Sequence, residues 1–315
     1  MLNLRYHVVS LVAVFLALGI GVIMGATVID RVTVDQLRNR LDSVEGSVRQ
    51  TRRDNDRLVA QVRTWERFAD QGRGELLAGQ LRGVPALVVA VDGIDRKPVE
   101  DLRTELAAAG ATVEGTVWLN DKLNLRSQAD ATALATALAL PEDTPDVLRA
   151  TALSRLAAVL HGAGDQAGVL PALRQAGFVD FDPPPSSTSP TTGPPAGPGA
   201  IPLGGTRSVV VSGAGARLDD DTMTLPFVTQ LALEGAPVVA AEAGRDTPGG
   251  RGVFVGLVRR RPETAARVST VDNLESFVGQ TAGVLALRDA GQGPAGQYGV
   301  GPGAQRLLPE PLPGT

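Results

Sequence analysis

A run of apolar residues close to the N-terminus is the first pattern in the chain. Residues 8–29 read VVSLVAVFLALGIGVIMGATVI and carry no charged side chain. A helix of this length spans roughly 33 Å, close to the thickness of the hydrocarbon core of a bilayer. The main alternative is a cleaved signal peptide, which has a shorter apolar region followed by a small-residue cleavage site. The pattern therefore predicts a retained single-pass anchor in the lipid bilayer.

Small residues recur at every fourth position within this anchor. The row consists of Ala13, Ala17, Gly21 and Gly25. On a helix these residues share one face, and a face of small residues lets two helix backbones approach closely, as in GxxxG dimers. We interpret the row as a candidate contact between two copies of the chain.

The next segment, residues 30–75, places apolar residues in alternating steps of three and four. Counted in heptads, position a holds Val34, Leu41, Val48, Asn55 and Val62, and position d holds Leu37, Val44, Thr51, Leu58 and Trp65. Valine at a favours two parallel strands, and one asparagine at a fixes their register at a cost in stability. The pattern predicts a coiled-coil stalk in a parallel homodimer. An amphipathic helix packed on its own domain is the alternative.

Three glycines mark the end of the predicted stalk helix. They are Gly72, Gly74 and Gly79. Glycine is common just after the last residue of a helix, so the stalk helix is expected to end in this region.

Residues 83–181 alternate between strand and helix patterns. A continuous apolar run at 84–91 and an alternating run at 111–119 predict strands, and helical spacing at 98–109 predicts a helix between them. Further helices are expected around 127–140, 146–161 and 168–176. A strand, a helix and a second strand in succession indicate a parallel sheet.

A segment rich in Pro, Ser, Thr and Gly, residues 182–206, interrupts this pattern and predicts a flexible linker. The α/β pattern then resumes over residues 207–290. Strands are expected at 208–212, 237–241 and 253–258, and helices at 225–234 and 274–290. Residues 291–315 are rich in Gly and Pro and predict a flexible tail.

These elements predict an α/β fold with a doubly wound, mostly parallel sheet. The linker at 182–206 is then an insertion between the two halves of the sheet. Two separate lobes are the alternative arrangement.

Composition and charge exclude several classes of function. The net charge is −4, so the chain lacks the basic balance of a nucleic-acid-binding protein. The short basic run 259–261 is interpreted as a solvated strand end. There is no cysteine, which excludes disulfides and thiolate chemistry.

The charges beside the anchor do not decide its orientation. Arg5 precedes the anchor, whereas Arg31, Arg38, Arg40 and Arg49 follow it. Long domains, however, cross the membrane largely regardless of flanking charge. Tracts of Ser, Thr and Pro are common on extracytoplasmic stalks. We therefore predict a cytoplasmic N-terminus at residues 1–7 and an extracytoplasmic body.

Candidates for catalysis or metal binding are few. A spanning anchor separates His7 from His161, so these two residues cannot form a site within one chain. The three aspartates 219–221 precede a predicted helix. Such a cluster can hold a hard cation, but more often its members are solvated or complement a helix N-terminus. We predict a chain that is not an enzyme, has no catalytic or cofactor-binding residue, and has metal ligands that the sequence does not identify.

Copper(I) prefers cysteine and methionine sulfur or imidazole. The methionines are Met1, Met24 and Met223, which do not cluster in the sequence. The residues by themselves therefore show no soft-metal site.

Both ends of the chain resemble the actinobacterial copper-transport protein B (MctB) family. The N-terminal segment of this chain, LRYHVVSLVAVFLALGIGVIMGA, looks like the start of that family. The C-terminal segment, STVDNLESFVGQTAGVLALRDAGQGPAGQYGVGPGA, is similar to the family's end. The order of anchor, coiled coil, α/β body and Pro-rich interruption is also similar. The resemblance implies a cell-envelope protein associated with copper efflux and low intracellular copper, acting as a pore. Copper is implied only by this resemblance.

A corynebacterial branch of the same family is linked to cell division and envelope remodelling through a partner protein. The resemblance therefore also implies an alternative function, a non-catalytic scaffold that binds a partner in division or cell-wall assembly. No metal-binding residue carries over from the family. Residues 271–273 and 296–299 lie within the resembling end and equally fit structural turns.

Overall fold

The computed structural model describes residues 4–141, 143–162, 166–184, 206–244 and 252–310. Most of the predicted linker, residues 185–205, lies outside the described residues. The chain divides into two compact units, residues 1–68 and residues 69–315.

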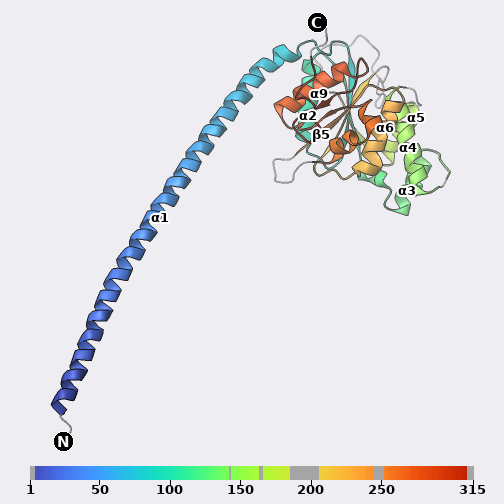
Figure 1. The fold of residues 1–315 in the computed structure, drawn as a ribbon. Coiled ribbons are helices and arrows are strands. Elements are labelled where there is room, and N and C mark those ends of the chain that lie inside the picture. The colour runs from blue at the N-terminus through green and yellow to red at the C-terminus, as the bar shows by residue number, and fades with distance from the viewer. Residues whose placement is uncertain (1–3, 142, 163–165, 185–205, 245–251, 311–315) are drawn as a thin grey trace. The chain divides into compact units, whose positions relative to one another are not determined.

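The N-terminal element is one helix, α1, which runs from Leu4 to Leu77 without a break (Figure 1). Within it, the stretch Arg5–Gly25 has a mean hydropathy of 2.7 and is long and apolar enough to cross a membrane; it is the one such stretch among the described residues. The helix continues through Gly72 and Gly74 and ends at Leu77, within the region marked by Gly72, Gly74 and Gly79 where its end was expected. A glycine in an exposed helix costs only about 1 kcal/mol, which a long helix tolerates.

The second unit is built around a seven-stranded sheet of order β3-β2-β1-β4-β5-β6-β7. The strands are β1 (Pro85–Val91), β2 (Thr112–Leu119), β3 (Val179–Asp182), β4 (Arg207–Gly213), β5 (Val238–Ala243), β6 (Ser269–Val271) and β7 (Gln297–Tyr298). Neighbouring strands are parallel except β2 and β3, which are antiparallel. The sheet is therefore mixed, and the predicted α/β class is confirmed.

Helices cover both faces of this sheet (Figure 1). They are α2 (Arg96–Ala108), α3 (Gln128–Ala137), α4 (Pro145–Leu160), α5 (Gln166–Gln175), α6 (Leu225–Leu233), α7 (Phe254–Arg259), α8 (Pro262–Ala265) and α9 (Phe277–Asp289). Successive strand residues point to opposite faces. In β1, Leu87 and Val89 enter a core with α3, α4 and α6, whereas Val88 and Ala90 enter a core with α2 and α9. β1 pairs with β4, so both predicted halves contribute to one sheet.

Two sequence-based expectations for the second half are wrong. The predicted strand at 253–258 is the helix α7, with Phe254, Val255 and Val258 buried. The short strand β6 pairs in parallel with β5 instead. The tail expected at 291–315 is also partly ordered, because Gln297–Tyr298 pairs in parallel with β6 as β7.

Candidate functional site

Acidic residues gather where β4, β5 and β6 end. Ligands of open α/β sheets bind outside the carboxyl ends of the parallel strands, so this edge is the first place to look for a site. Glu242 lies near the end of β5, Asp272 directly follows β6, and Asp220 follows β4. All three are buried. A cleft of about 340 Å³ is lined by Glu242, Arg259, Asp272, Glu275 and Gly301, among other residues.

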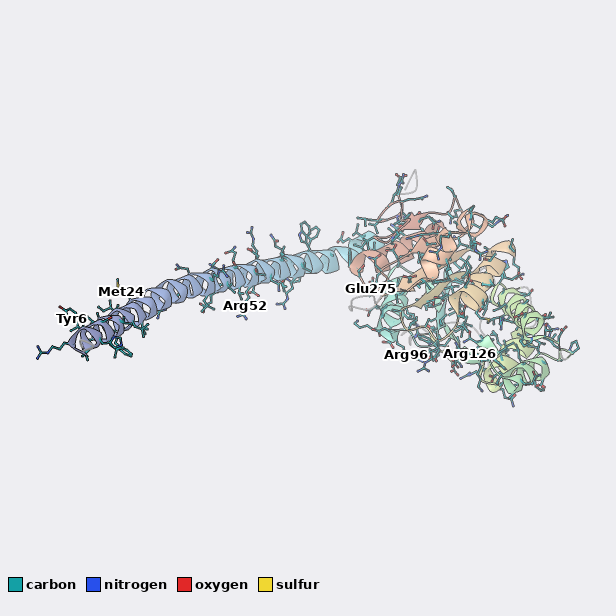
Figure 2. All side chains as sticks on the ribbon, turned by 60° about the horizontal axis from the view of Figure 1, so that its bottom comes forward. Tyr6, Met24, Arg52, Arg96, Arg126 and Glu275 are labelled. Carbon is teal, nitrogen blue, oxygen red and sulfur yellow. The ribbon has the colours of Figure 1, made fainter. Side chains whose placement is uncertain are left out.

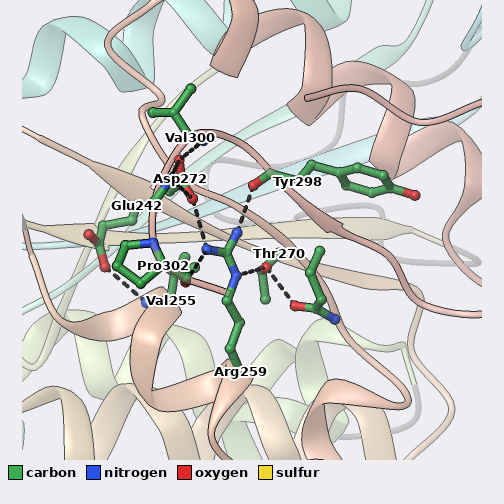
Figure 3. A network of polar contacts seen from close by, with 10 residues as sticks. Glu242, Val255, Arg259, Thr270, Asp272, Tyr298, Val300 and Pro302 are labelled. Atoms are coloured by element: carbon green, nitrogen blue, oxygen red, sulfur yellow. Dashed lines mark hydrogen bonds and ion pairs between the residues drawn. The ribbon is translucent and has the colours of Figure 1, made fainter. Parts of the chain in front are cut away.

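Arg259, at the end of α7, is the centre of a polar network at this edge (Figure 3). Its Nη1 donates to Asp272 Oδ2 at 2.8 Å and its Nε donates to Thr270 Oγ1 at 2.9 Å. The guanidinium also donates to the carbonyl oxygens of Tyr298, at 2.7 Å, and Pro302, at 3.0 Å. The side chain is only 7% exposed, so the interpretation of residues 259–261 as a solvated strand end is wrong for Arg259.

Asp272 joins this network to the loop that follows β7. Its carboxylate accepts backbone N–H groups from Val300, at 2.7 Å, and from Gly301, at 3.0 Å. The backbone of this loop approaches so closely that a Cβ added at Gly299 would overlap Asp272 Oδ1. Arg259 and Asp272 therefore hold the C-terminal segment against the sheet. The motifs at 271–273 and 296–299 have a structural role here.

Glu242 holds the start of α7 in a similar way. Its Oε2 accepts the N–H of Val255 at 2.9 Å. Burial raises the pKa of this carboxyl, and the nearby charges of Asp220 and Asp272 raise it further. The N–H of Val255 and the charge of Arg259 act in the opposite direction. The cleft is thus lined by a carboxyl whose pKa lies above that of an ordinary glutamate.

The aspartates 219–221 do not converge on one point. Asp219 caps the turn at Asp220–Thr224 by accepting the N–H of Thr222 at 2.9 Å, and this N–H lowers the pKa of Asp219. Asp220 accepts from Ser212 Oγ at 2.6 Å, and burial raises its pKa. Asp221 pairs with Arg261 at 3.6 Å. In the described parts of the chain, no group of three His, Cys, Asp or Glu residues is arranged to hold a metal ion.

The second candidate site is the set of predicted dimer residues, all of which lie on α1. Side chains are described for Ala13, Ala17, Gly21, Gly25, Leu41, Val44, Val48, Asn55, Leu58, Val62 and Trp65, and all are exposed except Gly25, which is half-buried. The side chains of Val34 and Leu37 lie outside the described residues. Leu41 is 58% exposed, Leu58 59% and Trp65 70%. A row of large apolar side chains is therefore open to contact.

Charged and polar pairs occupy other positions along the same helix. Glu45 and Arg49 form an ion pair at 3.2 Å, and Gln50 donates to Asp54 at 3.1 Å. Figure 2 shows Tyr6 and Met24 in the apolar part of α1 and Arg52 in its charged part. After residue 37, this distribution sets the apolar row at heptad positions a and d against mostly polar positions, with Val59 and Phe68 as exposed apolar residues outside the row.

The row on α1 is visible in the sequence, whereas the network around Arg259 is not. The available signal was an aspartate directly after a strand, in the motif Val271-Asp272-Asn273. This motif gave no indication that Asp272 pairs with Arg259, an arginine inside the basic run 259–261.

Fold and site together define a class, an α/β protein whose described residues include one candidate membrane span followed by an exposed helical segment. Residues 1–309 match the family described as "Copper transport outer membrane protein, MctB". The chain therefore belongs to the MctB family, which is a transport family and not an enzyme family.

Named relatives support this assignment. Copper transporter MctB of Mycobacterium tuberculosis (strain ATCC 25618 / H37Rv) is 26% identical over 328 residues, covering 98% of this chain and 99% of the relative. Copper transporter MctB of Mycobacterium leprae (strain TN) is 27% identical over the same coverage. The predicted family resemblance is confirmed.

The buried ion pair predicts a large effect of Arg259→Met. The variant leaves the charge of Asp272 buried without its cation, so the free energy of unfolding should fall by about 3 kcal/mol. Urea unfolding of residues 69–315 measures this. Arg260→Met, at the exposed neighbouring position, is the matched control and should be close to neutral. Equal effects of the two substitutions would contradict the role of the ion pair.

The raised pKa of Glu242 predicts a pH dependence of stability. The folded chain keeps this proton at pH values where the unfolded chain, with the ordinary value of 4.5, has released it. Ionisation of Glu242 therefore lowers folding stability as pH rises. Glu242→Gln keeps an acceptor for Val255 but cannot ionise. In urea unfolding, its stability relative to the unchanged chain should increase as pH rises above the unfolded-state value of 4.5, and parallel curves would refute the assignment.

Proposed function

We propose that this chain is a membrane-anchored cell-envelope protein that acts in copper efflux or copper homeostasis. The observation that carries the proposal is the extent of the family match, which covers residues 1–309, from the candidate span to the segment held by Asp272. The mycobacterial relatives, named copper transporters, are matched over 99% of their own length. The shared unit is thus the complete arrangement of span, stalk and α/β unit.

For the topology we propose a single pass through the cell membrane, with residues 1–7 in the cytoplasm and the α/β unit outside. The family description names an outer membrane protein, and our placement in the cell membrane departs from that description because of the helical form of the span. The candidate span Arg5–Gly25 is an apolar helix, the form in which chains cross a bilayer with all backbone groups satisfied. Translocation of a long C-terminal domain is compatible with the arginines after the anchor.

The proposal includes a parallel homodimer joined through the stalk. Leu41, Val44, Leu58 and Val62 are all more than half exposed on α1, within the predicted heptad register. Burying one Leu or Val side chain contributes about 1.5–3 kcal/mol, so a second copy in register gains from every layer. Asn55 at position a then fixes the alignment of the two strands. One span per chain encloses a pore only in an assembly, so dimerisation is also a first step towards any channel.

The alternative is a non-catalytic scaffold that binds a partner in cell division or cell-wall assembly. The observation in its favour is at the carboxyl edge of the sheet. There, Arg259 and Asp272 are occupied in holding the C-terminal segment, and Glu242 holds the start of α7. Because these side chains bind other parts of the same chain, they make this edge of the sheet rigid, which suits a surface that binds a partner protein.

The experiment is deletion of the gene in the parent bacterium, followed by measurement of cell copper and of growth in copper. We expect cell copper to rise and tolerance to fall, and the full-length chain to restore both. The double variant Leu41→Asp/Leu58→Asp places charges in the stalk contact and should fail to restore them. Gly46→Asp/Ala60→Asp adds the same charges at exposed f positions and should succeed.

Unchanged copper content and tolerance in the deletion strain would refute the copper proposal. Recovery of a division or wall-synthesis protein by crosslinking to the full-length chain in that case would support the scaffold alternative. If both double variants restore copper content equally, the stalk contact plays no part in the function.

A further inference from the structure

The stalk register determines which face of the membrane helix meets a second copy. Residues on an uninterrupted helix have fixed angular positions relative to one another. Helix α1 is one continuous α-helix from Leu4 to Leu77, so no break in the helix resets the phase between anchor and stalk. The heptad positions of the stalk can therefore be counted back into the anchor.

Counting back in sevens from Val34 gives an apolar seam inside the membrane. Position a falls on Ala13 and Ile20, and position d falls on Val9, Leu16 and Ile23. Val9 is 68% exposed, Leu16 65% and Ile20 54%, so these side chains present a surface of the helix. Thr27 and Asp30 take the next a and d positions, at the end of the apolar run. From Ile23 back to Val9, every residue at position a or d is apolar.

The row of small residues leaves this seam. In the same register Ala13 is at a, Ala17 at e, Gly21 at b and Gly25 at f. Each step of four residues turns the row by about 50° relative to a seam of 3.5 residues per turn. Gly25 consequently lies on the side of the helix opposite the stalk contact. The small-residue row and the stalk seam cannot both be buried between the same two unbroken helices.

We propose that the two anchors of the dimer pack along Val9, Ala13, Leu16, Ile20 and Ile23, as a left-handed continuation of the stalk. This inference rests on the proposed parallel homodimer. Membrane helix bundles are mostly left-handed, with crossing angles of about 20° as in soluble coiled coils. The paired stalk also holds the anchors at high effective concentration, so a modest contact in the membrane suffices. Ala17, Gly21 and Gly25 turn progressively away from the partner helix, towards lipid.

Cysteine crosslinking tests the proposal, because the chain has no cysteine of its own. Single variants Leu16→Cys and Ile20→Cys report on the seam, and Gly21→Cys and Gly25→Cys report on the small-residue row. Leu41→Cys and Leu58→Cys report on the stalk, with Gly46→Cys at an exposed f position as the matched control for Gly25→Cys. Each full-length variant is oxidised in native membranes with an oxidant that contains no copper, and the disulfide-linked dimer is quantified.

We expect several-fold more crosslinked dimer at 16 and 20 than at 21 and 25, and several-fold more at 41 and 58 than at 46. Preferential crosslinking at 21 and 25 with an intact stalk signal would overturn the proposal, since it would place the small-residue row in the contact. Stalk crosslinks without any signal at 16 and 20 would overturn it as well, because the anchors would then splay apart. Loss of the signal at 41 and 58 would instead refute the homodimer itself.

Discussion

Apolar side chains on an otherwise charged helix need a partner, and a continuous helix determines where that partner lies. These two constraints act together on α1. Leu41, Val44 and Leu58 are exposed along one row, and the helix carries the phase of that row into the candidate membrane span. A second copy in register buries every apolar side chain of the row, because two identical helices aligned in parallel place the same heptad positions opposite one another. The proposals for the stalk and for the anchor follow from this geometry.

The α/β unit applies a different principle at the carboxyl edge of its sheet. In many α/β proteins the polar groups at this edge are directed at a ligand. Here Arg259, Asp272 and Glu242 are directed at backbone groups of the chain itself. These contacts hold the C-terminal segment against the sheet, where its residues Gln297–Tyr298 pair with β6 as the strand β7. This arrangement fits the breadth of the family match, which extends to residue 309 and so includes the strand β7.

Long elements could be predicted from sequence because they contain enough residues to show a period. The strands β1, β2 and β4, and the helices α2 and α9, agree with the predicted ranges to within a few residues. The run at 253–258 was mistaken for a strand because a short apolar run has the same appearance in a buried helix. Its buried residues Phe254, Val255 and Val258 satisfy either pattern, and in the structure they lie on the helix α7.

The short strands β3, β6 and β7 contain two to four residues each, too few to show any period. They exist because neighbouring strands offer backbone partners, which no local pattern reveals. The same limit applies to the site. Arg259 looked solvated beside two further arginines, and only the fold brings Asp272 to it. The heptads of the stalk, in contrast, are a local pattern, so the residues of the proposed dimer contact can be named from the sequence alone.

The most direct measurement of the central claim is the mass of the soluble part of the chain in solution. Sedimentation equilibrium of residues 30–315, which contain the whole stalk and none of the apolar span, reports that mass. A parallel two-stranded stalk predicts the mass of two chains over a range of concentrations. A monomer at every concentration would contradict the account.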